Sequence, residues 1–204
     1  MLPNESVSNV PNTAMKMIVV FLGMTASGKS TLGEAWAKAC RAAYHNTDRV
    51  RKELAGLEPT DRHPDQVAQG IYSTVFTEAT YQALLDYTRK DFAQGYGMVV
   101  LDGSYSKHRD RDQVRSLAEE LGGRSVFVFC TCSEAEVQRR LARRERDPEA
   151  VSDGRWEIYQ YQQATFEVPN ALEERGCIIL DTEQSVGKMV TWLAAHPLLQ
   201  GHCH

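Results

Sequence analysis

The sequence contains no long apolar segment, which sets the first limit on its class. Nowhere in its 204 residues is there a run of about 18 apolar residues, the length needed to cross a bilayer. The N-terminal segment 1–16 also lacks the basic start and the apolar stretch of a secretory signal. We therefore expect a cytoplasmic protein with no membrane span.

Positive charge is not in surplus either. The formal net charge is −4, from 23 Lys and Arg against 27 Asp and Glu. Proteins that hold long nucleic acid mainly through its phosphates usually carry a surplus of basic residues. The charge balance thus argues against long nucleic acid as a partner, although one local basic cluster exists at 139–146.

Cysteine is scarce, and its five positions do not follow the spacing of a disulfide framework or of a metal site. Cys130 and Cys177 lie in apolar runs and are expected to be small core residues. We expect no disulfide and no metal bound by cysteine.

What is present is the composition of an ordinary globular domain, with 42% hydrophobic and 25% charged residues. The polar segment 1–14 is expected to be a flexible tail, and 15–204 a single domain. Short apolar runs predict five strands, at 17–22, 42–46, 97–102, 124–130 and 176–181. Apolar residues recur between these runs with helical spacing, for example at Ile71, Val75, Ala79 and Ala83. This alternation predicts an α/β fold in which a parallel sheet has helices on both faces.

The stretch Phe21–Leu32, FLGMTASGKSTL, follows the first apolar run and fits the pattern G-x-x-x-x-G-K-[ST]. Its two glycines permit backbone angles and close approaches that a Cβ would block, so that successive N–H groups can surround an anion. The following helix adds its free N–H groups and the positive end of its dipole. We therefore expect this loop to bind a nucleoside triphosphate, with Lys29 on the outer phosphates and Ser30 on Mg²⁺. The expected nucleotide-binding residues are Gly23, Ala26, Ser27, Gly28, Lys29, Ser30 and Thr31.

Other motifs favour a kinase over the other proteins that use such a loop. Signalling GTPases carry an NKxD-type guanine motif, which the chain lacks; this also favours ATP over GTP. ATPases usually place an acidic residue directly after the aspartate that ends the third strand, to orient water. Here Gly103 and Ser104 follow Asp102, so the activation of water has little support.

A kinase needs a carboxylate beside the acceptor hydroxyl, at the carboxyl ends of the strands. Asp48 follows the second predicted strand, and Arg51 lies on the same face of the next helical turn. Asp48 can take the acceptor proton, unless it is only a helix N-cap, and Arg51 can hold an anionic or hydroxylated substrate. Asp102 can bind the water shell of Mg²⁺ or orient the acceptor. Ser104 and Arg109 can line the acceptor pocket, or equally belong to a solvated helix start.

Five arginines crowd one predicted helix and its end, at Arg139, Arg140, Arg143, Arg144 and Arg146. Pairs of like charge at i, i+4 repel one another in isolation, and a bound triphosphate would turn that repulsion into attraction. The alternative is a solvated face on which glutamates neutralise the arginines. We expect a small arginine-rich lid at about 139–153.

Four stretches together resemble a known family: GMTASGKST, NTDRVRKELAG, VVLDGSYSKHRDR and VQRRLARR. They are similar to the small bacterial P-loop kinases often called AAA-type kinases. These in turn resemble the kinase domain of polynucleotide kinase and, more distantly, gluconate kinase, the zeta toxins and chloramphenicol phosphotransferase. The resemblance implies a P-loop three-layer sandwich with a five-stranded parallel sheet in the order 2-3-1-4-5.

The resemblance also implies roles for single residues. Asp48 would be the general base and Arg51 a substrate contact, while Arg139 and Arg143 would be lid arginines near ATP. The family often has LDAT at the third strand, where this chain has LDGS, so that Ser104 stands in the place of a threonine.

The sequence therefore predicts a kinase that uses ATP and Mg²⁺ to phosphorylate a hydroxyl of a small-molecule or nucleotide-like acceptor. Lys29, Arg139 and Arg143 would offset charge on the transferred phosphoryl group. Two alternatives stay open: a nucleotide-binding regulatory module with weak ATPase activity, and a nucleic acid 5′-hydroxyl kinase.

Overall fold

The computed structural model describes residues 15–61, 70–146, 154–170 and 174–201. The expected tail, 1–14, and the second half of the expected lid, 147–153, lie outside the described residues.

The five strands lie in one parallel sheet, in the order β2-β3-β1-β4-β5. Their bounds are β1 Met17–Leu22, β2 Ala43–Asn46, β3 Met98–Gly103, β4 Arg124–Thr131 and β5 Cys177–Asp181. Each bound lies within one residue of the predicted run. The α/β class, the parallel sheet and its order are therefore confirmed, with β1 as the central strand.

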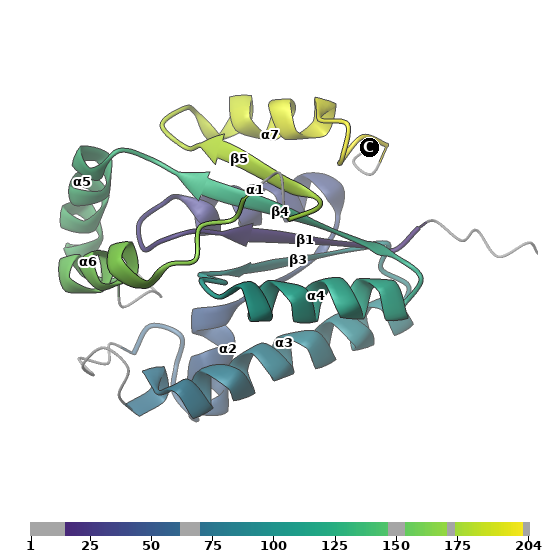
Figure 1. Ribbon diagram of the computed structural model, residues 1–204, viewed down its shortest axis with the longest axis horizontal. Helices are drawn as coiled ribbons and strands as arrows, with labels where there is room; N and C mark the ends of the chain where they lie inside the picture. Colours follow the sequence, from purple (N-terminus) through teal and green to yellow (C-terminus); the bar gives the residue numbers. More distant parts are fainter. Residues whose placement is uncertain (1–14, 62–69, 147–153, 171–173, 202–204) are drawn as a thin grey trace, which may run out of the picture.

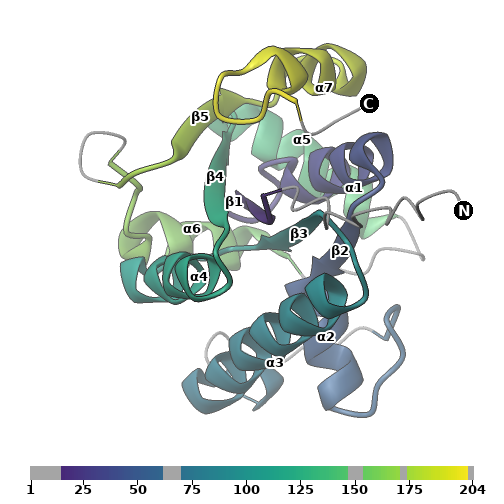
Figure 2. The same ribbon diagram turned by 90° about the vertical axis from the view of Figure 1, so that its right-hand side faces the viewer.

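Helices cover both faces of this sheet (Figures 1 and 2). Their bounds are α1 Lys29–Cys40, α2 Thr47–Leu54, α3 Thr74–Ala93, α4 His108–Glu120, α5 Glu134–Glu145, α6 Trp156–Thr165 and α7 Val186–Ala195. A short 3-10 helix, Gly70–Tyr72, precedes α3. α1 and α7 pack on one face, and α3 and α4 on the other, with α2 beside α3.

The central strand is apolar throughout because both of its faces are covered. Ile18 and Val20 contact the core formed with α3 and α4. Val19 and Phe21 contact the core formed with α1 and α7. This burial on two sides explains why β1 is an uninterrupted apolar run rather than an alternating one.

The buried face of α3 differs from the predicted stripe. Ile71 lies in the 3-10 helix before α3, and Val75 is 77% exposed. The face of α3 that packs on the sheet consists of Thr80, Tyr81, Leu84, Leu85, Thr88 and Phe92. These positions also have helical spacing and carry larger side chains, so their burial removes more apolar area from water.

Two further sequence expectations concern the cysteines and the membrane. Cys130, Cys132 and Cys177 are free thiols, whereas Cys40 is disulfide-bonded, so the expectation of no disulfide is wrong for Cys40. Among the helices that the structure describes, none has the length and apolar character to cross a membrane.

α5 and α6 lie beyond the carboxyl ends of the strands (Figure 1). Val137 of α5 and Tyr159 of α6 form a small buried cluster with Ala26, in the loop between β1 and α1. Apolar contacts thus hold these two helices against the end of the sheet at which the sequence predicts the site.

Candidate functional site

The loop between β1 and α1, residues 23–28, has the backbone of a phosphate loop. Gly23, Ala26 and Gly28 have φ angles of 149°, 58° and 86°, which allow neighbouring N–H groups to turn toward a common side. A Cβ on Gly23 would also lie 2.6 Å from the carbonyl oxygen of Cys130, so the close packing at the end of β4 excludes a side chain. Gly28 is the N-cap of α1 and has no side chain to accept from the first turn. The N–H groups that begin α1 therefore have no capping side chain and are suited to binding an anion.

Asp102, at the end of β3, is fully buried. Its Oδ2 accepts hydrogen bonds from the Tyr44 hydroxyl at 2.7 Å and from the Asn46 amide at 2.5 Å. Both donors belong to β2, and the parallel register places Asn46 opposite Asp102. The second oxygen, Oδ1, has no hydrogen-bond partner among the described residues.

The surroundings of Asp102 act on its pKa in opposite directions. Burial raises the pKa of this carboxyl above its usual range, while the charge of Lys29 and polar contacts from Ser30, Tyr44 and Asn46 oppose the rise. Burial and the neighbouring Asp102 also raise the pKa of Tyr44. The Tyr44 hydroxyl therefore stays protonated and donates to the carboxylate.

Asn46 also positions Asp48. Its Oδ1 accepts from the backbone N–H groups of Asp48 at 3.0 Å and of Arg49 at 3.1 Å, which makes Asn46 the N-cap of α2. The alternative that Asp48 is itself the cap therefore does not hold. The carboxylate of Asp48 is therefore not used as the cap of α2.

Arg51 lies one turn further along α2 and is 6% exposed. Its Nη1 donates to the carbonyl oxygen of Ile71 at 3.1 Å and to Oγ1 of Thr77 at 3.2 Å. Its guanidinium lies 5.0 Å from the centroid of the Tyr72 ring. Its Nε is buried and has no hydrogen-bond partner within the described part of the chain. Arg51 is thus fixed in place while one donor remains unused.

One cleft, with a volume of about 120 Å³, brings several of the expected site residues together. It is bounded by the phosphate loop, by α2, by the segment after β3 and by α6. Its lining residues are Thr25, Lys29, Thr47, Asp48, Arg51, Tyr72, Ser104, Gly154, Ile158 and Gln162. Four residues chosen from the sequence therefore share one space: Lys29, Asp48, Arg51 and Ser104.

Of the two residues expected in the acceptor pocket after β3, only Ser104 lines the cleft. Its hydroxyl lies 3.2 Å from the Tyr81 hydroxyl, which also accepts from the Tyr105 N–H at 3.1 Å. The side chain of Arg109 is 61% exposed and pairs with Glu78 at 2.8 Å on the outer surface. The structure thus places Arg109 outside the cleft, on the solvated start of α4.

A buried ion pair fixes the segment after β3. Tyr105 has a φ of 42°, an angle that side chains other than glycine rarely adopt. Arg111 of α4, 1% exposed, donates to the Tyr105 carbonyl oxygen at 2.8 Å and to both carboxylate oxygens of Glu174 at 2.8 and 2.5 Å. Arg115 adds a further hydrogen bond to Glu174 at 2.7 Å. These contacts hold the unfavourable turn beside Ser104.

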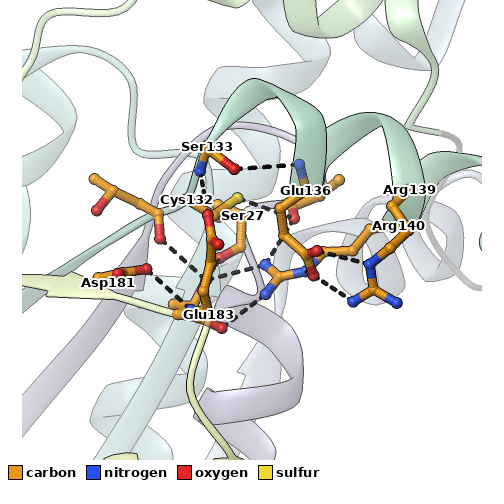
Figure 3. Close-up of polar contacts among 11 residues, drawn as sticks. Ser27, Cys132, Ser133, Glu136, Arg139, Arg140, Asp181 and Glu183 are labelled. Carbon is orange, nitrogen blue, oxygen red and sulfur yellow. Dashed lines mark hydrogen bonds and ion pairs between the residues drawn. The ribbon is translucent and has the colours of Figure 1, made fainter.

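Among the arginines of α5, Arg140 contacts the phosphate loop. Its guanidinium donates to the carbonyl oxygen of Ala26 at 3.1 Å, and to Oγ1 and the carbonyl oxygen of Thr182 at 2.9 and 2.7 Å. Arg139 has a 69% exposed side chain and pairs with Glu136 at 2.6 Å. Figure 3 shows the two guanidinium groups on either side of the Glu136 carboxylate. Only one of these neighbouring arginines therefore faces the loop.

One turn further along α5, Arg143 and Arg144 differ in the same way, since one is exposed and the other is partly buried. Burial lowers the pKa of Arg144, and the charges of Asp48 and Asp102 oppose that change. Arg144 thus lies within electrostatic reach of both carboxylates of the site, whereas Arg143 is exposed. The structure therefore places Arg139 and Arg143, the expected lid arginines, on the solvent side, and Arg140 and Arg144 toward the site.

The sequence itself carries a signal for this orientation, in the apolar residues beside the arginines. Val137 and Leu141 pack into the apolar cluster with the phosphate loop. They stand at i and i+4, and Arg140 and Arg144 stand at i+3 and i+7 on the same helical face. Gln162 of α6 also lines the cleft, but no comparable pattern in the sequence indicates that its side chain faces the site.

Solved structures with this fold include several kinases. An unliganded sugar kinase from Janibacter sp. HTCC2649 is 19% identical, with a TM-score of 0.62 over 92% of this chain and 99% of that chain. A gluconokinase from Sinorhizobium meliloti 1021 is 23% identical, with a TM-score of 0.57 over 86% and 87% of the two chains. The APS kinase CysC of Mycobacterium tuberculosis, in complex with AMPPNP and APS, is 18% identical, with a TM-score of 0.58 over 87% and 95%. At these identities the likeness establishes the fold.

A search of curated proteins finds no match to the chain. The family model described as AAA domain matches residues 18–169. This match spans the phosphate loop, both site carboxylates, α5 and α6, and covers well over half of the sequence. The chain therefore belongs to this AAA-domain family and has the fold of the P-loop kinases.

Proposed function

We propose that the protein is an ATP-dependent phosphotransferase that moves the γ-phosphoryl group to a hydroxyl of a small-molecule or nucleotide-like acceptor. The observation that carries this proposal is that Lys29 of the phosphate loop shares one cleft with Asp48 and Arg51 of α2. Such a cleft brings together the phosphoryl donor, a base and a contact for the acceptor. The M. tuberculosis APS kinase, solved with the ATP analogue AMPPNP, supports ATP as the donor.

In the proposed reaction, the acceptor oxygen attacks the γ-phosphorus while the bond from that phosphorus to the β,γ-bridging oxygen breaks. The proton of the acceptor hydroxyl passes to the Asp48 carboxylate, and ADP leaves. Because the transition state of phosphoryl transfer is loose, the position of the acceptor matters more than the strength of the base. The cap that Asn46 provides for α2 fixes the backbone of Asp48, to which the acceptor hydroxyl would give its proton.

Positive charge offsets the charge on the transferred group and on the leaving diphosphate. We assign this task to Lys29, Arg140 and Arg144. Arg139 and Arg143 were expected in this role, but both are exposed, and Arg139 is already paired with Glu136.

Asp102, at the end of β3, and Ser30, in the first turn of α1, fit Mg²⁺. Oδ1 of Asp102 is a buried acceptor with no hydrogen-bond partner among the described residues, and the Ser30 hydroxyl is close enough to affect the pKa of that carboxyl. Ser30 would bind the ion, and Asp102 would bind the water molecules that Mg²⁺ retains. When bound, the ion would neutralise charge on the β- and γ-phosphates.

The acceptor side of the cleft favours a compact molecule with a polar or anionic group. Arg51 has an unused donor and is held against the Tyr72 ring, and Ser104 adds a hydroxyl. A volume of about 120 Å³ suits the reacting part of a small molecule rather than a bulky one. A hydroxyl compound that carries a phosphate or carboxylate would engage Arg51 directly.

A screen of sugars, nucleosides, aminoglycosides and 5′-hydroxyl oligonucleotides for acceptor-dependent release of ADP tests the proposal. Acceleration by a small molecule, with the phosphorylated product identified by mass spectrometry, would support it. Slow hydrolysis that no acceptor accelerates would favour the regulatory ATPase module. Acceleration by oligonucleotides alone would favour a nucleic acid end kinase.

A further inference from the structure

Gln162 of α6 forms a hydrogen bond to the phosphate loop. Its side-chain carbonyl accepts from the backbone N–H of Thr25 at 2.7 Å. A second contact lies just before α6, where a Cβ on Gly154 would fall 2.0 Å from Oγ1 of Thr25. The chain that leads into α6 thus lies directly against the loop, and a side chain at 154 would force the Thr25 hydroxyl to move.

Gln162 lies in the cleft where the proposed reaction would place the terminal phosphate. Thr25, Lys29, Asp48 and Gln162 line the same cleft. If Asp48 takes the acceptor proton, the γ-phosphorus lies in this cleft, because the phosphorus and the base must both reach one hydroxyl oxygen. The N–H group of Thr25 is then a donor to the γ-phosphate, and the Gln162 carbonyl occupies that donor in this structure.

A phosphate oxygen and the Gln162 carbonyl compete for this N–H group, because both are acceptors. Glutamine, however, carries an acceptor and a donor on one terminal amide. Rotation about its last side-chain torsion exchanges Oε1 for Nε2, and this torsion has two broad minima. The same side chain can therefore accept from the loop when no phosphate is present and donate to the phosphate when it is bound.

We propose that Gln162 recognises the third phosphate of the nucleotide and so determines specificity for a triphosphate over a diphosphate. With ADP bound, the hydrogen bond between Thr25 and Gln162 stays in place. With ATP bound, Thr25 donates to the γ-phosphate and the rotated Gln162 amide donates to it as well. This inference rests on the proposed function, since it requires a triphosphate in the loop.

Two affinities measured by titration calorimetry on the full chain test the inference: the Kd for AMPPNP and the Kd for ADP, each with Mg²⁺. Gln162→Glu keeps the shape and the acceptor but loses the donor and adds a negative charge. We expect it to weaken AMPPNP binding relative to ADP binding by at least about tenfold. Gln162→Lys places a side chain that only donates at this position. We therefore expect the ratio of the Kd for AMPPNP to the Kd for ADP to shift in the opposite direction. Gln160→Glu adds the same charge at an exposed position of α6, and its ratio should stay within about twofold of the wild type, because solvent screens that charge.

The outcomes separate this inference from the proposed function. A wild-type protein that binds neither nucleotide would overturn the proposed function itself. A wild-type protein that binds both, with Gln162→Glu and Gln162→Lys shifting the ratio in the same direction or not at all, would overturn the role of Gln162 alone. If one variant does not fold, as judged by circular dichroism, the direction of the shift in the other still decides.

Discussion

The contacts of Arg140 lead to a prediction that separates the two sides of α5. Its side chain is 21% exposed and pairs with Glu136 at 2.6 Å, and its guanidinium also donates to Ala26 and Thr182. Ala26 and Thr182 are each 2% exposed, so Arg140→Ala would take a charged donor away from buried acceptors. Ala26 would keep only the contact from Cys132 Sγ, and Thr182 Oγ1 would keep its own hydrogen bonds to the carbonyl oxygens of Ser27 and Thr131. A hydrogen bond from a charged group contributes about 1.5–3 kcal/mol, and losses at neighbouring contacts are not additive. We expect the free energy of unfolding to fall by about 2–4 kcal/mol.

Thermal unfolding measures this loss. For a domain of this size, each kcal/mol corresponds to roughly 2–4 °C in Tm, so Arg140→Ala should lower Tm by roughly 5–15 °C. The rise in Tm on addition of AMPPNP should also be smaller, because the variant loses a positive charge beside the loop. Arg139→Ala is the matched control, since it removes the same group one residue away and from the same partner, Glu136. Water screens the exposed guanidinium of Arg139, and the Tm of this variant should stay close to that of the wild type.

The comparison between the two variants is decisive. Equal losses of Tm, or a larger loss for Arg139→Ala, would refute the reasoning about which face of α5 lies on the loop. A normal Tm for Arg140→Ala together with an unchanged effect of AMPPNP would refute the role of Arg140 as well.

Lys29→Ala is expected to abolish phosphoryl transfer. Asp48→Asn should leave nucleotide binding, measured by calorimetry, nearly intact but remove turnover in the ADP-release assay. Full activity of Asp48→Asn would mean that another group is the base. A further prediction concerns acid stability. Burial favours a higher pKa for Glu174, but its hydrogen bonds to Arg111 and Arg115 and their charges outweigh burial and lower the pKa from 4.5 to about 2. The ionised pair therefore contributes fully to stability above pH 4.5, and its contribution is lost as the pH falls toward 2. Urea unfolding should show Glu174→Gln less stable than the wild type at neutral pH, with the gap narrowing as the pH falls below 4.5; a gap independent of pH would contradict this assignment.

The strands and the phosphate loop were predictable from the sequence because local residues determine both. A parallel strand with helices on both faces needs an uninterrupted apolar run, and Met17–Leu22 is such a run. The loop needs small residues at the points where φ is positive or a neighbour is close, and Gly23 and Gly28 stand at these points. The order of the strands was available only through the family resemblance, since the runs themselves do not say which strands pair.

The side that a helix turns toward the site was harder to predict, because charge alone does not define a face. In α5, one arginine pair at i, i+4 looks like the other, and only the apolar neighbours Val137 and Leu141 distinguish them. In α3, the stripe of Val and Ala was smaller than a competing stripe with Tyr, Leu and Phe, and the larger side chains took the core. The contact between Gln162 and Thr25 depends on how α6 packs at the end of the sheet, which no local pattern encodes.

The two carboxylates of the site are positioned by one amide, and this links the fold to the proposed chemistry. The parallel register brings Asn46, at the end of β2, opposite Asp102, at the end of β3. There the Asn46 Nδ2 donates to Asp102 while its Oδ1 caps the helix that carries Asp48. Aspartate at 46 would keep the cap of α2 but lose the donor to Asp102, and alanine at 46 would lose both. Only a side chain with a donor and an acceptor on one planar group can hold the Asp102 carboxylate and the start of α2 together, so the demand for asparagine at 46 follows from the register of two strands.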